Sequence, residues 1–247
     1  MLVLGIETAT AQSSVCLATE HGTVASASIA RGRAHAQFLT PAIAFCLDQA
    51  SLNLSAVSGL AVSLGPGLFT GLRVGVATAQ TIAHARRLPV VGLASLDLLA
   101  YPVRHVRRLI CSVLDARRGE LFWAFYRTVP GGVQRMTDYR VGPASKIAGE
   151  IEAVPDDVLC IGDGAVAHRS LFESTGAEVG SSSSAYPSAQ ALVELALPRF
   201  IREDTQRPED LLPIYVRKAD ARINWSNRGA LFGGVAPGTP LPGRATE

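Results

Sequence analysis

Short apolar runs and amphipathic stretches alternate along the first hundred residues. Three apolar runs at the amino end are separated by polar turns, which predicts three strands, the first two joined as a hairpin. In the next stretch apolar side chains recur every three or four positions, the spacing of an amphipathic helix, and Pro41 within it indicates a kink or a late start. The predicted elements are strands at 2–8, 13–19, 23–29, 57–64 and 89–93, and helices at 34–50 and 70–86.

The same order of elements begins again near residue 108. An apolar run there is closed by Asp115, as the first run is closed by Glu7. Two units that each run β-β-β-α-β-α predict a duplicated α/β fold with a mixed sheet in each half. Sequence identity between the halves is negligible, so the duplication rests on the order of elements. The predicted elements are strands at 109–114, 120–128, 133–141 and 158–161, and helices from about 145, at 165–174 and at 188–203.

The duplication predicts two domains and a tail. Pro102 and the basic residues of the stretch 101–107 interrupt the apolar pattern, which favours a boundary there. Beyond Trp225 the chain becomes rich in Gly and Pro, which is typical of a disordered segment. The predicted parts are an N-terminal domain at 1–104, a C-terminal domain at 105–225 and a disordered tail at 226–247.

The composition is that of a folded protein in aqueous surroundings. Of the 247 residues, 48% are hydrophobic and 18% are charged, which excludes a disordered chain. No apolar run approaches the roughly 18 residues of a membrane span. The amino end meets Glu7 too soon for a signal peptide. We therefore expect a cytoplasmic protein without a membrane partner.

The residue types give no sign of a metal site. The four cysteines include no C-x-x-C pair, and the five histidines include no pair three or four positions apart. The net charge of +2 is too small to require a nucleic-acid partner. The cysteines are therefore predicted to be reduced thiols of the core, and no metal is expected.

A glycine-rich corner follows the predicted strand at 57–64 and precedes a predicted helix. Its sequence, Gly-Pro-Gly-Leu-Phe-Thr-Gly at 65–71, fits neither a P-loop, which needs Lys after its last glycine, nor a dinucleotide fingerprint. Thr70 is predicted to be the helix N-cap. A phosphate cradle and a purely structural tight turn both stay open. The residues that could lie near a nucleotide are Thr8, Thr10, Gly65, Gly67 and Thr70.

Two such units in tandem resemble the actin, Hsp70 and sugar kinase superfamily, whose domains have the ribonuclease H-like fold. Four segments sharpen the match, because their order and spacing are similar to those of the TsaB (also called YeaZ) family over about residues 1–225. Any one of the segments alone is a weak signal. The four segments are GIETAT at 5–10, GPGLFTGLR at 65–73, DARRGE at 115–120 and PIYVR at 213–217.

The resemblance implies a function that the residues alone do not supply. It implies a non-catalytic paralogue of TsaD, the subunit that transfers a threonylcarbamoyl group to the adenosine next to the anticodon of certain tRNAs. It further implies that this chain binds and activates TsaD, that TsaE, an ATPase, joins the complex, and that tRNA is contacted indirectly. No resident cofactor is expected, although the resemblance allows ATP or ADP at the interface with TsaD.

The departures from catalytic relatives fit this interpretation. TsaD-like proteins carry a metal-binding His-x-x-x-His after the strand that 89–93 resembles, whereas this chain has Ser95 and Leu99 at those positions. TsaB corners usually carry Ser where this chain has Leu68, so contact of this side chain with a phosphate is not expected. We expect Glu7 to satisfy backbone donors at the strand end, and the lone His35 to cap or pack against its helix.

Two helical faces are candidates for contact with a partner. Small residues recur every four positions after the corner and leave a smooth face that another helix can approach closely. Packing on its own sheet would use the same face, so both uses stay open. Together with the resemblance, the two faces predict the docking surface for TsaD and, without TsaD, for a homodimer. The predicted interface residues are Phe38, Ile43, Leu47, Gly71, Val74, Gly75, Thr78, Ala79 and Ile82.

Two other functional classes stay open. A small-molecule kinase of the same superfamily would need a nucleotide site within this chain, and tight ATP binding by the isolated protein would favour it. A glycoprotease-like peptidase would need a zinc motif or a Ser, His and Asp set, and the spacing of the residues assembles neither.

Overall fold

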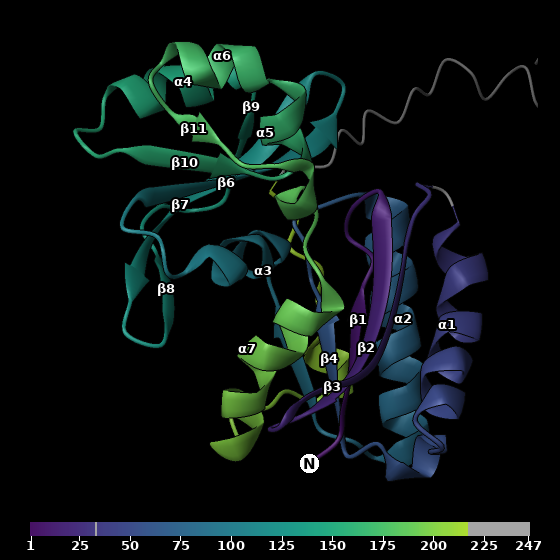
Figure 1. The fold of residues 1–247 in the computed structure, drawn as a ribbon. Coiled ribbons are helices and arrows are strands. Elements are labelled where there is room, and N and C mark those ends of the chain that lie inside the picture. The colour runs from purple at the N-terminus through teal and green to yellow at the C-terminus, as the bar shows by residue number, and fades with distance from the viewer. Residues whose placement is uncertain (33, 217–247) are drawn as a thin grey trace, which may run out of the picture. The chain divides into compact units, whose positions relative to one another are not determined.

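Two mixed β-sheets flanked by helices make up the fold in a computed structural model that describes residues 1–32 and 34–216 (Figure 1). In the first sheet the strands lie in the order β3-β2-β1-β4-β5. The hairpin strands β1, β2 and β3 are antiparallel, whereas β4 and β5 follow helical crossovers and run parallel to β1. The strands are β1 (Val3–Glu7), β2 (Gln12–Thr19), β3 (Gly22–Ala30), β4 (Gly59–Ser63) and β5 (Val90–Leu93).

The second sheet repeats this plan. Its order is β11-β10-β6-β7-β8, with β6 antiparallel to β7 and parallel to β10, and β9 also pairs with β7. Both sheets therefore have the ribonuclease H-like strand order, and the predicted fold class is confirmed. The strands are β6 (Leu109–Arg117), β7 (Glu120–Val129), β8 (Gly132–Arg135), β9 (Arg140–Gly142), β10 (Val158–Ile161) and β11 (Glu178–Val179).

The single strand predicted at 133–141 is wrong, because β8 and β9 are separate strands. Between them Thr137 interrupts the ladder, since its Oγ1 accepts the hydrogen bond of the Phe125 N–H at 3.1 Å. The Met136 N–H donates to the carbonyl of the same Phe125 at 2.7 Å. The chain thus changes its pairing within four residues.

Helices cover both faces of the first sheet. Side chains of α1 (His35–Gln49) and α2 (Phe69–Arg86) pack with one set of strand residues, and those of α7 (Ala189–Ile201) pack with the alternate set, on the opposite face. The sequence placed this last helix in the second repeat. It lies instead on the first sheet, because its apolar stripe of Leu192, Val193 and Phe200 covers the face opposite α1 and α2.

Shorter helices flank the second sheet. The helix α3 belongs to the first half of the chain, but its Leu96 and Leu99 are buried with Ile110 of β6. Each half thus contributes a helix to the core of the other half, and the domain boundary at 104/105 stays a prediction. These helices are α3 (Ser95–Ala100), α4 (Ala144–Glu152), α5 (Asp163–Ala167) and α6 (Arg169–Ser174).

Two further predictions concern Pro41 and the end of the chain. Pro41 lies inside α1, which already begins at His35, so the late start is wrong. Residues 1–216 form one compact unit. The predicted disordered tail at 226–247, and Arg217 of the fourth family segment, lie outside the described residues.

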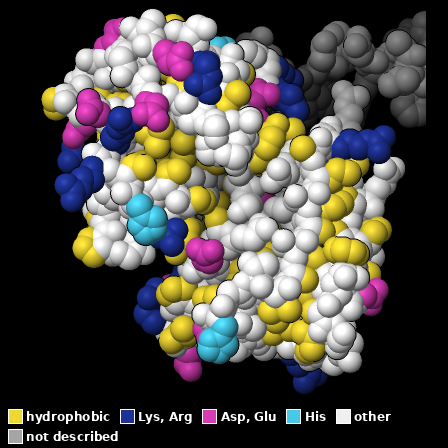
Figure 2. Space-filling model, in the orientation of Figure 1, with side chains coloured by type: hydrophobic (Ala, Val, Ile, Leu, Met, Phe, Trp, Pro, Cys, Tyr) yellow, Lys and Arg dark blue, Asp and Glu magenta, His cyan; other side chains and the backbone are white. Residues whose placement is uncertain are grey.

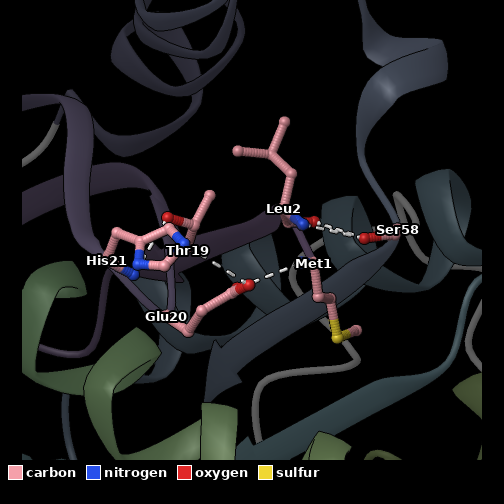
Figure 3. A network of polar contacts seen from close by, with 6 residues as sticks. All are labelled: Met1, Leu2, Thr19, Glu20, His21 and Ser58. Carbon is pink, nitrogen blue, oxygen red and sulfur yellow. Dashed lines mark hydrogen bonds and ion pairs between the residues drawn. The ribbon is translucent and has the colours of Figure 1, made fainter.

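Polar contacts at the amino end hold the start of β1 against its neighbours (Figure 3). The Met1 ammonium group pairs with the Glu20 carboxylate at 3.1 Å, at the end of β2. The Leu2 N–H donates to Ser58 Oγ at 2.9 Å, and this hydroxyl donates to the Leu2 carbonyl at 3.0 Å, just before β4. These contacts help to fix the strand that carries Glu7.

All four cysteines of the chain lie in its core. Cys16, Cys46, Cys111 and Cys160 are all buried free thiols, as predicted. Burial raises the pKa of Cys16 to about 11, so this thiol is protonated and unreactive at neutral pH. Among the described residues, no helix combines the length and the apolar character that crossing a membrane requires.

Candidate functional site

The carboxylate of Glu7 lies at the end of β1 and is fully buried. Its Oε1 accepts the Ala9 N–H at 2.5 Å, while its Oε2 has no partner. Burial disfavours the charged form and raises the pKa of Glu7 to about 7. The Ser63 hydroxyl and the Ala9 N–H oppose this shift, although Ser63 Oγ lacks hydrogen-bonding geometry. The predicted role of Glu7 as an acceptor for the backbone is confirmed.

A cavity of about 390 Å³ lies where the two halves meet. On the side of the second half, the Asp163 carboxylate accepts the Asp115 N–H at 3.0 Å. The Asp115 carboxylate in turn accepts the Arg117 N–H at 2.7 Å and its guanidinium at 3.0 Å. The lining consists of Thr10, Ala11, Leu68, Asp115, Arg117, Leu121, Asp163, Gly164, Ala167, His168 and Tyr186.

Two groups in this cavity have perturbed acidity. Burial raises the pKa of Asp163 above its ordinary value, and the nearby Asp115 charge adds to the shift. Burial also raises the pKa of Tyr186, and the Asp163 charge contributes there as well. Two carboxylates beside a single guanidinium suit a proton donor or a cation better than a phosphate.

The glycine corner is held by contacts within the first half. The Leu68 N–H donates to the Ala9 carbonyl at 2.7 Å, and the Gly65 carbonyl accepts the Ser95 N–H at 2.8 Å. The Ser95 hydroxyl donates to the Pro66 carbonyl. These groups are therefore engaged in closing the turn.

The residues predicted to lie near a nucleotide lie in different surroundings. Thr10 lines the cavity, whereas Thr8 is buried and donates to the Gly71 carbonyl at 2.8 Å. Gly65 is buried, Gly67 is half-buried and Thr70 is exposed. Of the five, Thr10 alone lines the described cavity, so any nucleotide role for the others stays a prediction.

Thr70 is not the N-cap of α2. The helix begins at Phe69 with Leu68 as its N-cap, and no side chain caps it. The Leu68 carbonyl accepts the first helical hydrogen bond from Leu72 at 3.0 Å, while the Leu68 N–H is fixed by Ala9. The contact with Ala9 thus places the N-cap two residues earlier than the sequence suggests.

The smooth face of α2 packs on its own sheet. A methyl group at Gly71 would collide with the Thr8 carbonyl, and one at Gly75 with Thr8 Oγ1. Ala79 is fully buried in the same core. This corrects the expectation of a partner surface for Gly71, Gly75 and Ala79, because close approach to β1 is what requires the small residues.

The other six predicted interface residues divide into two groups. Ile43 and Leu47 of α1 are 8% exposed and belong to the core of the first half, which corrects their assignment to an interface. The four others keep part of their surface in solvent. These half-buried residues are Phe38, Val74, Thr78 and Ile82.

His35 packs at the start of α1. Its Nδ1 lies 2.7 Å from Ser13 Oγ of β2, and both residues are buried. Burial lowers the pKa of His35, so the imidazole is neutral at pH 7. His35 does not cap its helix, and its packing against that helix stays a prediction; the side chain joins α1 to β2.

The profile of the family described as "TsaD: tRNA N6-adenosine threonylcarbamoyltransferase" matches residues 20–225. The chain belongs to the TsaD family.

Relatives within the TsaD family refine this placement. A Mycobacterium tuberculosis protein without a described function is 33% identical over 89% of this chain and 93% of its own. The Escherichia coli "tRNA threonylcarbamoyladenosine biosynthesis protein TsaB" is 28% identical over 88% of this chain and 95% of its own. YeaZ from Pseudomonas aeruginosa has a TM-score of 0.75 at 30% identity, over 87% of this chain and 99% of that one. The resemblance to TsaB (YeaZ) is confirmed.

Two positions that would hold metal ligands in catalytic relatives have structural roles in this TsaD-family chain. Ser95 and Leu99 stand where the resemblance implied metal ligands in catalytic relatives. The Ser95 hydroxyl is bonded to the Pro66 carbonyl, and Leu99 is 3% exposed. Within residues 1–32 and 34–216, no group of three or more His, Cys, Asp or Glu side chains is arranged to hold a metal ion.

Sequence reasoning missed several polar and aromatic residues of this family member. Asp163 and Tyr186 line the cavity with Asp115, although the sequence shows only that Asp163 follows a strand. Phe69 and Tyr215 are in contact and largely exposed. The spacing of Phe69 and Arg73, four residues apart on one helix, was the available signal for this second cluster.

Proposed function

We propose that this protein acts in threonylcarbamoyladenosine modification of tRNA as the subunit that binds and activates TsaD. The observation that carries the proposal is the match to TsaB of Escherichia coli along 88% of this chain and 95% of that protein. The match to YeaZ in structure, over 99% of that chain, supports it. TsaE joins through the complex, and tRNA is the substrate of the assembly.

The chemistry of the chain supports a non-catalytic role. The two ligand positions of the catalytic relatives carry Ser95 and Leu99, and both side chains are engaged in packing or in closing the corner. Glu7 is fully buried and accepts a hydrogen bond from its own loop. A group without access to substrate cannot act as a general acid or base.

The docking surface for TsaD lies on the solvent side of α1 and α2. Hydrophobic side chains gather on the side of the molecule that these helices form (Figure 2). We define this α1–α2 face by Phe38, Val74, Thr78 and Ile82, which are half-buried. Partly exposed apolar side chains on two adjacent helices are suited to burial against a partner helix. Without TsaD the same face pairs two copies of the chain.

A nucleotide, where one takes part, belongs at the interface with TsaD rather than in the cavity. The cavity lining carries Asp115 and Asp163, whose negative charge opposes phosphate. The Leu68 N–H of the corner is already used by the Ala9 carbonyl. The residues of this chain therefore do not form a phosphate cradle of their own around the cavity.

The test is binding to cognate TsaD by the Ile82→Arg variant. Arginine at a half-buried apolar position of the α1–α2 face should weaken the complex at least about tenfold, the size of an ordinary hot-spot effect. Leu171→Arg is the matched control, because Leu171 is an apolar helix residue, 37% exposed, on α6 of the second half.

Both variants should melt within a few degrees of the wild type. Tight TsaD binding by a folded Ile82→Arg variant would remove the α1–α2 face from the interface. Equal losses of TsaD affinity in the two variants would show that any new surface arginine disturbs the complex. This result would also remove the α1–α2 face from the interface.

A further inference from the structure

An aromatic cluster with one arginine lies at the first turn of α2. The rings of Phe69 and Tyr215 are 6.0 Å apart between centroids and tilted by 37°. The guanidinium carbon of Arg73 lies 3.9 Å above the Phe69 ring. Phe69 is 54% exposed and Tyr215 55%, so contact with each other leaves about half of each side chain in water. We call these three residues the aromatic platform.

The cation of this platform differs from the other cations that lie over rings in the described residues. Arg104 over Tyr101 lies 4.0 Å from the Glu194 carboxylate. The other two cations also lie near a carboxylate. Arg135 lies over Tyr139, and its charge lowers the pKa of Asp97. Lys146 lies over Trp123, whose ring N–H donates to the Glu150 carboxylate.

Arg73 has no such partner within residues 1–32 and 34–216. Residues 49–96, which include the whole of α2, contain no Asp or Glu, whereas they contain Arg73, Arg86 and Arg87. The segment Pro208–Asp210 packs near α2 and brings Glu209 and Asp210, but both carboxylates are paired with Arg207. The platform therefore presents aromatic surface beside an uncompensated positive charge.

We propose that the aromatic platform binds an unpaired base of RNA. Base stacking on exposed aromatic side chains, with arginine beside them for stacking or phosphate contact, is how single-stranded nucleic acid is commonly held. Residues 49–96 carry arginines without a carboxylate, and such one-signed positive charge matches the polyanionic backbone of RNA. The inference goes beyond the proposed function, which requires no contact between this chain and RNA.

The test measures RNA binding by the full chain alone, so its outcome does not depend on TsaD. The probe is a fluorescein-labelled uridine-rich RNA strand of about 12 nucleotides, within the roughly 4–16 that such sites cover. The same strand annealed to its complement is the second probe. We expect the single strand to bind more tightly, because the bases of a duplex are not free to stack on a side chain.

Four variants separate stacking from general apolar contact. Phe69→Ala and Tyr215→Ala should each weaken single-strand binding about tenfold. Phe69→Leu keeps apolar volume without a π-face and should lose nearly as much. Phe45→Ala is the matched control, since Phe45 is 51% exposed on the neighbouring α1, and it should bind as the wild type does.

The contribution of the Arg73 charge is measured separately, from the salt dependence of RNA affinity. Arg73→Gln should reduce the slope of log affinity against log salt by about 0.7, the value for one phosphate contact on a single strand. Because all these side chains are exposed, thermal melts should show folded proteins.

Three results would overturn the proposal. The first is a wild type that does not bind the single strand. The second is equal binding by Phe69→Ala and Phe45→Ala. The third is unchanged RNA affinity in Phe69→Ala with lost binding to TsaD, which would assign the platform to protein docking instead.

Discussion

The two halves of the molecule end their first strands with a carboxylate, but in opposite surroundings. Glu7 at the end of β1 is fully buried, has one oxygen without a partner and has a pKa raised to about 7. Asp115 near the end of β6 is 36% exposed, pairs with Arg117 and lines the cavity. The same place in a repeated topology is thus a structural group in one half and a surface group in the other.

The two carboxylates differ in what surrounds the end of their strands, although α5 approaches β6 closely through Gly164 as α2 approaches β1. In the first half, Gly71 and Gly75 let α2 press against Thr8, the residue that follows Glu7. In the second half, the region beyond Asp115 opens into the cavity of about 390 Å³. Packing rather than the order of elements therefore decides which carboxylate meets solvent.

The largest effect should come from the pH dependence of stability at Glu7. The pKa of Glu7 is raised from 4.5 to about 7 on folding, so its stabilising contribution is complete below pH 4.5 and is lost as the pH rises to 7. The loss amounts to about 3 kcal/mol. Urea unfolding of wild type and Glu7→Gln between pH 4.5 and 8 gives two curves, whose difference should grow by that amount in favour of the variant.

The difference between the two curves isolates Glu7, because the other carboxylates titrate in both proteins. Parallel curves would mean that Glu7 is not held in a desolvated site, and the contrast with Asp115 would fail.

The next effect tests the close approach of α2. Gly75→Ala places a methyl group against Thr8 Oγ1 and should destabilise the protein by about 2 kcal/mol, as overpacking does. Gly149→Ala is the matched control, because Gly149 is a helical glycine of α4 with nothing near its missing methyl group. Alanine there should stabilise by up to about 1 kcal/mol through helix propensity. If the melting temperatures of both variants shift in the same direction, α2 and α4 do not differ in the space around their glycines.

The smallest effect belongs to the exposed carboxylate. The ion pair of Asp115 with Arg117 joins side chains that are 36% and 56% exposed, so Asp115→Asn should change the free energy of unfolding by less than about 0.5 kcal/mol at pH 7. Chemical denaturation measures this directly. A decrease of several kcal/mol in the free energy of unfolding would mean that Asp115 affects stability as strongly as Glu7 does.

Local patterns predicted much of the fold. The apolar runs at 2–8, 13–19 and 23–29 are β1, β2 and β3, and the helix predicted at 70–86 is α2 apart from its first residue. These elements follow from periodicity and turn residues, which are encoded locally. The attachment of α7 to the first sheet was not predictable, because it depends on which apolar face lacks a cover.

The candidate site was less accessible from sequence than the fold. The small residues of α2 signalled a close approach, but only the position of Thr8 shows that β1 is the partner. Thr70 fits the composition of an N-cap, yet a backbone contact of Leu68 with Ala9 starts the helix. Asp163 joins Asp115 through a hydrogen bond between residues 48 positions apart, which no local pattern encodes.

We propose that TsaD requires this chain and that the chain itself supplies no catalytic group. The most direct measurement is tRNA modification by cognate TsaD, TsaE and the enzyme that makes threonylcarbamoyl adenylate, with this protein present, absent or replaced by Glu7→Gln. We predict modification that depends on the protein and is close to normal with Glu7→Gln, because the buried carboxyl has only a structural role. Undiminished modification without the protein, or loss of modification with a folded Glu7→Gln variant, would contradict this proposal.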